Sequence, residues 1–105
     1  MDLASLKHTA DLAHNIAVEK QNALERLRSR QLLVYHDHVF VADAATITMA
    51  HVLREANQGR ASYLLDSNNN PCRIDDMADF VTRLVEKNQE ALNSYHQIFQ
   101  SFRRK

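Results

Sequence analysis

Apolar residues recur at intervals of three and four along the N-terminal part of the chain. They fall at Leu3, Leu6, Ala10, Ala13, Ala17, Leu24 and Leu27, and a second set, Leu12, Ile16 and Ala23, widens this stripe. The spacing is the heptad-like pattern of a helix that packs against another helix. The segment from about Asp2 to Gln31 also contains no glycine or proline and is rich in good helix formers. We therefore predict one long helix here.

A helix of this length is too long for a compact domain of this size. At 1.5 Å per residue it would extend roughly 40 Å, whereas a compact chain of about 100 residues has a radius of gyration near 13 Å. We therefore expect its N-terminal half to project. The candidate protein-interaction residues are Leu3, Leu6, Ala10, Ala13 and Ala17. They would meet a helix of a partner or of a second copy, unless the helix folds back along the C-terminal helix.

The pattern changes from helical to strand-like after the long helix. β-branched and aromatic residues dominate from Leu32 to Val41, interrupted by His36 and Asp37. This pattern predicts two short strands joined by a tight turn. A helix is then expected to begin at Asp43, a good N-cap residue, and to end with a left-handed cap at Gly59, the only glycine in the chain.

The remaining residues predict a second hairpin and a second long helix. The strands are expected at Ala61 to Leu65 and Cys72 to Ile74, around an asparagine-rich turn from Asp66 to Asn70. Asp75 or Asp76 should cap the last helix. Its expected core stripe comprises Met77, Val81, Leu84, Ala91, Tyr95, Ile98 and Phe102, with Phe80, Leu92 and Phe99 beside it.

The predicted order is helix, hairpin, helix, hairpin, helix, which defines an α+β fold. We expect the two hairpins to join into one small antiparallel sheet packed by the helices. Two parts follow from this order: residues 1–30 form a long helix that is a candidate assembly or coiled-coil element, and residues 31–105 form a compact α+β domain. A chain of 105 residues is long enough for one such core.

Charge and composition exclude several classes of partner. The chain has 13 basic and 13 acidic residues, so its net charge is zero and we expect no nucleic acid partner. We also expect no membrane partner, because no stretch approaches the ~20 apolar residues of a membrane helix. The N-terminal sequence does not have the pattern of a signal peptide. The single cysteine, Cys72, fits a protein made in a reducing cytoplasm.

The residues most suggestive of chemistry are His36, Asp37 and His38. Two histidines could supply two ligands to a metal, but a metal site needs three or more that converge. The simpler interpretation is a hairpin turn, since histidine and aspartate adopt positive φ more readily than most residues. We predict no metal, cofactor, catalytic residue or small-molecule substrate, so the chain is not expected to be an enzyme. A small metal-binding or regulatory protein that uses these histidines is the alternative.

The order of elements and several spaced residues resemble a domain of unknown function in bacteriophage tail proteins. In "VYHDHVFVADAATITMAHVL", the residues Tyr35, His38, Phe40 and Asp43 match the family's tyrosine, turn, histidine, x, phenylalanine, x, aspartate pattern. The stretches "ALERLRSRQLL" and "YLLDSNNNPCRIDDMADFVTRL" are similar to the segments that flank the family's two hairpins. The likeness covers about Ala23 to Arg104. The chain departs from the family at two places. His36-Asp37 occupies the first hairpin turn, where the family commonly has Asn-Gly, and Tyr63 lies in the third strand, where the family often has a tryptophan.

The resemblance implies a non-enzymatic role, because the family occurs at the C-terminal end of tail-fibre and tail-fibre-assembly proteins. The chain is then expected to be a structural part of the virion tail, made in the host cytoplasm. Its partners would be other phage tail proteins or further copies of itself, and the symmetry of phage tails favours a trimer. An alternative within the same context is an assembly chaperone that is absent from the mature virion.

Overall fold

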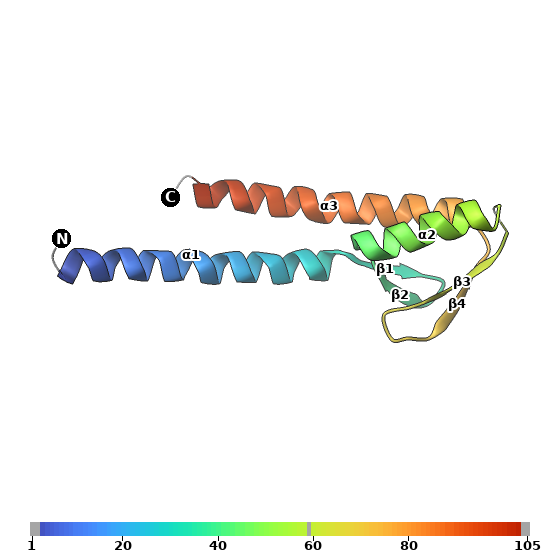
Figure 1. Cartoon of the computed structure of the whole chain (residues 1–105), viewed down its shortest axis with the longest axis horizontal. Coiled ribbons are helices and arrows are strands. Elements are labelled where there is room, and N and C mark those ends of the chain that lie inside the picture. Colours follow the sequence, from blue (N-terminus) through green and yellow to red (C-terminus); the bar gives the residue numbers. More distant parts are fainter. Residues whose placement is uncertain (1–2, 59, 104–105) are drawn as a thin grey trace.

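The computed structural model describes residues 3–58 and 60–103 and has the predicted α+β architecture (Figure 1). Three helices alternate with two β-hairpins. The elements are α1 (Leu3–Arg30), β1 (Leu32–Tyr35), β2 (His38–Val41), α2 (Ala44–Ala56), β3 (Ser62–Leu65), β4 (Pro71–Ile74) and α3 (Met77–Arg103). The two long helices lie side by side and antiparallel, while α2 and both hairpins gather at one end (Figure 1).

The molecule is strongly elongated. Its principal extents are 67 × 24 × 21 Å and its radius of gyration is 19.4 Å, whereas a compact chain of this length would have a radius of gyration near 13 Å. The C-terminal half of α1 folds back on α3, but its N-terminal part extends past the C-terminal end of α3 (Figure 1). The long helix therefore both folds back and projects.

The contact between α1 and α3 includes one buried alanine from each helix. Ala23 on α1 and Ala91 on α3 are both buried. Ile16, Leu24 and Leu27 on α1 are half-buried, as are Tyr95 and Ile98 on α3. Small side chains allow two helix backbones to approach closely. The C-terminal half of α1 is thus held by Ile16 and Ala23 of the second set together with Leu24 and Leu27.

The first hairpin has the tight turn that the sequence predicts. β1 and β2 are antiparallel, with Leu32 opposite Val41 and Tyr35 opposite His38. The two residues between them, His36 and Asp37, have φ values of 49° and 66°. Positive φ at both central residues is the requirement of the type I′ turn, whose twist matches that of the strands. The histidine-aspartate pair is therefore part of a turn.

The expectation that both hairpins would join into one sheet is wrong. β3 pairs only with β4, in a register that sets Ser62 opposite Ile74 and Leu65 opposite Pro71, so the fold has two separate two-stranded sheets. The hairpins meet instead through one backbone hydrogen bond, which the Ser67 N–H donates to the carbonyl oxygen of Val39 at 2.7 Å. A single bond from a turn residue does not make a ladder between strands.

Aspartate side chains cap the second and third helices. The Asp43 carboxylate accepts a hydrogen bond from Thr46 N at 2.9 Å, and the Asp76 carboxylate accepts one from Asp79 N at 3.0 Å. Asp75, the other candidate cap of α3, instead pairs with Arg73. The expected cap at Gly59 lies outside the described residues.

The core lies between α3, α2 and the inner faces of both hairpins. Its largest fully buried side chains are Phe40, Phe80, Ile74, Met77 and Leu84. The Phe80 ring is edge-on to Tyr35 and to Phe40, each at 4.9 Å between centroids. Such edge-to-face pairs are favourable beyond the burial of apolar area. The predicted stripe of α3 is buried from Met77 to Ala91 and half-buried at Tyr95 and Ile98. The Phe102 side chain is outside the described residues.

Candidate functional site

The predicted interaction residues form an exposed apolar strip, which we call the α1 seam. Leu3 is 85% exposed and Leu6 is 56% exposed. Ala10, Ala13 and Ala17 continue the seam and are exposed as well. The structure therefore leaves all five candidate residues accessible on one helix. Exposed leucines repeated at helical spacing favour an interaction with another helix.

The α1 seam, as far as Ala17, lies beside the side of α1 that is most buried against α3, and Leu24, which continues the same stripe, is half-buried. Successive residues of an α-helix are rotated by about 100°, so the seam lies about 100° around α1 from the side that carries Ile16, Ala23 and Leu27. That second side is the one that packs on α3. The packing of α1 on α3 therefore leaves the seam exposed to solvent, because a different side of the helix makes the contact with α3.

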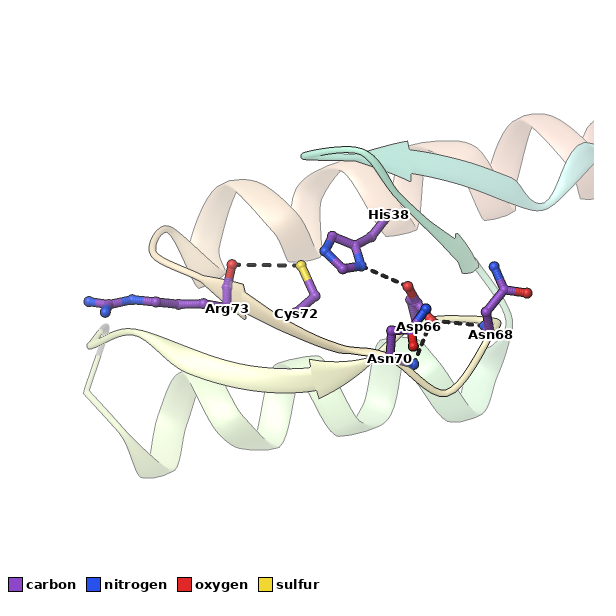
Figure 2. A network of polar contacts seen from close by, with 6 residues as sticks. All are labelled: His38, Asp66, Asn68, Asn70, Cys72 and Arg73. Carbon is purple, nitrogen blue, oxygen red and sulfur yellow. Dashed lines mark hydrogen bonds and ion pairs between the residues drawn. The ribbon is translucent and has the colours of Figure 1, made fainter.

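The strongest polar cluster in the described residues is centred on Asp66, at the junction of the two hairpins (Figure 2). Asp66 Oδ2 is 2.7 Å from His38 Nδ1, and Asp66 Oδ1 accepts hydrogen bonds from the backbone N–H groups of Asn68 and Asn70 at 2.8 and 2.9 Å. The Asp66 side chain is only 4% exposed. One carboxylate thus fixes its own turn and ties that turn to β2.

These hydrogen bonds favour the charged form of the carboxylate. The bond from His38, and next the bond from the Asn70 backbone, hold the pKa of Asp66 below its ordinary value. Aspartate commonly organises a turn by accepting backbone N–H bonds two or more residues further on. The cluster therefore has a complete structural explanation as a clamp between the hairpins.

The two histidines of the first hairpin have different partners. The His36 ring lies edge-on to the Tyr35 ring with 4.2 Å between centroids, while His38 is bonded to Asp66. In the described part of the chain, no group of three or more histidine, cysteine or acidic residues is placed to hold a metal ion. The geometry thus uses the histidines for packing and for the clamp.

Cys72 lies in β4 close to this cluster (Figure 2). It is buried, and its thiol donates a weak hydrogen bond of 3.7 Å to the carbonyl oxygen of Arg73. Burial, and next the nearby charge of Asp66, raise the pKa of the Cys72 thiol. A nucleophilic cysteine needs the opposite shift, since the thiolate is the reactive form. Cys72 is therefore suited to packing rather than to covalent chemistry.

The four residues that carry the resemblance each have a structural role. Tyr35 and Phe40 belong to the aromatic core, His38 clamps the second hairpin and Asp43 caps α2. The Tyr35 hydroxyl also donates to Asp79 at 3.4 Å. The four-residue pattern thus has a structural explanation, because these residues attach the first hairpin to α2, to α3 and to the second hairpin.

A second exposed apolar region lies between α2 and β3. Met49, Tyr63 and Leu65 are each more than half exposed, and they line a shallow groove of about 510 Å³ together with Ala45, Thr46, Leu53 and Leu64. The sequence did not predict this groove. The alternation of side chains along β3 does not show which face of an isolated two-stranded sheet packs against the rest of the protein.

The comparisons with known proteins identify no relative. No protein-family model, curated protein or solved structure matches the chain. In the part of the chain that the structure describes, no helix has both the length and the apolar character needed to span a membrane.

Proposed function

We propose that this chain is a non-enzymatic structural component of a bacteriophage tail and acts by packing its helices against other proteins. The observation that carries the proposal is the α1 seam, a heptad-spaced strip exposed on the part of α1 that projects beyond α3. The tail context is supported by the resemblance of Ala23 to Arg104 to the domain found in tail-fibre proteins.

The shape supports a connector role. The hairpins and α2 form a core at one end, and the projecting helix carries apolar residues more than 20 Å away along α1, at about 1.5 Å per residue. An element of this kind can reach into a neighbouring protein while its own core stays folded. The alanines at the centre of the seam would allow close approach of a second helix.

An assembly chaperone is the second candidate. The same exposed seam favours it, because a chaperone that covers a fibre surface also needs an apolar helix face that its own fold leaves free. The two candidates differ in the finished particle, since a tail component remains there and a chaperone leaves.

The test is incorporation into particles when the gene in the phage genome carries Leu6→Asp together with Ala13→Asp. The wild-type chain should be found in purified particles, and the double variant should be lost from them, because two carboxylates in an apolar helix contact are costly to bury. Val18→Asp is the matched control, since Val18 is an exposed apolar residue of α1 that lies about 100° from the seam.

Each outcome separates the candidates. Incorporation of the double variant at the wild-type level contradicts packing through the seam. A wild-type chain that is absent from particles, yet needed for fibre-bearing particles, supports the chaperone. A wild-type chain that is absent and dispensable contradicts both candidates.

A further inference from the structure

The second hairpin leaves the backbone edge of β3 unpaired. The Asp66 N–H donates to the carbonyl oxygen of Asn70 at 2.9 Å, so these two residues are a hydrogen-bonded pair at the end of the ladder. Hydrogen-bonded and non-hydrogen-bonded pairs alternate along an antiparallel ladder. Leu65, which lies opposite Pro71, is therefore in a non-hydrogen-bonded pair, and so is Tyr63 two residues earlier. The N–H and C=O groups of Tyr63 and Leu65 thus point away from β4.

Nothing in residues 3–58 and 60–103 pairs with this edge. β3 forms a ladder only with β4, and the backbone bond between the two hairpins is made by Ser67, beyond the end of the strand. The Tyr63 and Leu65 side chains are 66% and 60% exposed. A strand edge with free N–H and C=O groups is a template for pairing with another extended chain.

The opposite edge of the hairpin does not have this property. Pro71 occupies an outward-pointing position of β4, and proline has no N–H to donate. Proline at such a position is one of the ways in which sheet edges are protected from pairing. The hairpin therefore offers the edge of β3, rather than that of β4, to a further strand.

The apolar groove between α2 and β3 runs along this same edge, since β3 lies between β4 and α2 (Figure 2). Successive side chains of a strand point to opposite faces, so Leu64 is on one face of the hairpin while Tyr63 and Leu65 are on the other. All three line the groove, which a groove on one face alone would not allow. The opposite wall is formed by the α2 residues Ala45, Thr46, Met49 and Leu53.

The lining of the groove determines which side chains an added strand can have. None of the seven described residues that line it is charged. A strand laid against β3 would direct alternate side chains toward Met49 and Leu53 on α2. Burial of a charge there would be costly, so the positions that face α2 should be apolar.

We propose that the edge of β3 is a docking site for an extended segment of another protein, which adds to the second hairpin as a third strand. Tyr63 and Leu65 supply the backbone hydrogen bonds, and α2 binds the apolar side chains at every second position of the segment. Main-chain bonds combined with pockets for alternate side chains are a general mode of peptide recognition. A second copy's β3 does not fit this site, because it has its own α2 along the same edge and the two helices would compete for one side of the joined sheet.

This docking site is additional to the proposed function. It is a different surface from the α1 seam, and it takes an extended partner rather than a helical one. Its failure would leave the test of incorporation through the seam unaffected.

The first test is amide hydrogen exchange of the full chain, observed by NMR. The Leu64 N–H points toward β4, so its protection should exceed that of the Tyr63 and Leu65 N–H groups at least about tenfold. Equal protection of the three amides would overturn the open edge. Protection of Tyr63 and Leu65 that grows with protein concentration would also overturn the proposal, because a second copy would then pair there.

The second test is titration with a short capped peptide of alternating valine and threonine. The amide signals of Tyr63 and Leu65 should shift, and their exchange should slow as the peptide binds. The same peptide with every amide N-methylated is the matched control, because it keeps the side chains but has no N–H groups to pair with a strand. It should bind at least about tenfold more weakly. Equal binding of the two peptides, or no shift at Tyr63 and Leu65 with millimolar peptide, would contradict the docking site.

Met49→Glu tests the wall of the groove, and Val52→Glu is its control. The two side chains are 51% and 52% exposed on α2, but of the two only Met49 lines the groove. Met49→Glu should weaken binding of the valine-threonine peptide at least about fivefold, and Val52→Glu should leave it unchanged. Circular dichroism should report the wild-type helix content for both variants. Equal effects of the two substitutions would overturn the role of the groove.

Discussion

The His38 imidazole and the Asp66 carboxylate, 28 residues apart in sequence, lie 2.7 Å from each other and join the two hairpins. The only other direct polar link between these hairpins in the described residues is the backbone bond from Ser67 to Val39. Because no ladder of strand hydrogen bonds connects the two sheets, the packing of one hairpin on the other depends strongly on this pair.

Asp66→Ala should therefore lower the melting temperature more than Asp66→Asn does. Alanine leaves His38 and the backbone N–H groups of Asn68 and Asn70 without their acceptor, whereas asparagine keeps one oxygen. Asp75→Ala, which breaks only the exposed pair with Arg73, is the control and should change the melting temperature little. Equal effects of Asp66→Ala and Asp75→Ala would contradict the clamp.

The clamp should also make stability depend on pH in the acid range. The pKa of Asp66 is lower in the folded protein than its ordinary value of 3.8. A group of this kind stabilises the fold at pH values above its unfolded pKa, and this stabilisation is lost as the pH falls through the folded pKa. The free-energy difference between wild type and Asp66→Asn, from urea titrations, should be larger at pH 5 than at pH 3. A free-energy difference that grows as the pH falls would contradict a stabilising role of the charged Asp66 carboxylate.

Asp37→Gly should stabilise the protein. Asp37 has a φ of 66° in the first hairpin turn and its side chain is exposed, so glycine removes a steric cost without removing a buried contact. The expected gain in the free energy of unfolding is about 0.5–1 kcal/mol, measured by urea denaturation. Asp11→Gly in the exposed part of α1 is the contrasting change and should lower stability slightly, by about 0.3 kcal/mol, because glycine is an even poorer helix former than aspartate. A loss of stability in Asp37→Gly would contradict the type I′ turn.

Phe80→Ala should remove most of the stability of the core. Phe80 is fully buried and its ring contacts both Tyr35 and Phe40. Truncation of a buried phenylalanine to alanine costs about 3–5 kcal/mol. Leu92→Ala, at a position of the same helix that is 40% exposed, should cost far less. Similar losses in the two variants would mean that the core is not where the structure places it.

Native Cys72 should react slowly with thiol reagents. The side chain is buried and its raised pKa keeps it protonated at neutral pH. Labelling by a maleimide at pH 7 should therefore be at least about tenfold slower in buffer than in denaturant. Rapid labelling of the native chain would indicate an accessible and activated thiol instead.

Features determined by neighbouring residues were predictable from the sequence. The cap at Asp43 and the turn at His36 and Asp37 follow from local backbone chemistry, and the structure has both. The stripe of α3 was also predicted over most of its length, although Phe80, expected beside it, is fully buried.

Features that depend on distant contacts were not predictable. Nothing local to β2 or β3 excludes a joined sheet, and the link between Asp66 and His38 exists only once the hairpins meet. Two apolar strips at adjacent angles on α1 did not indicate which would face α3.

The most direct measurement of packing through the seam is photocrosslinking in cells that assemble particles, with p-benzoylphenylalanine in place of Leu6. Leu6 is large and exposed, so the substitution should leave the core intact. We predict a covalent adduct with a second copy of the chain or a tail protein, identified by mass spectrometry, and no such adduct from the same group placed at Val18. Equal labelling from both positions, or none from position 6, would contradict the account.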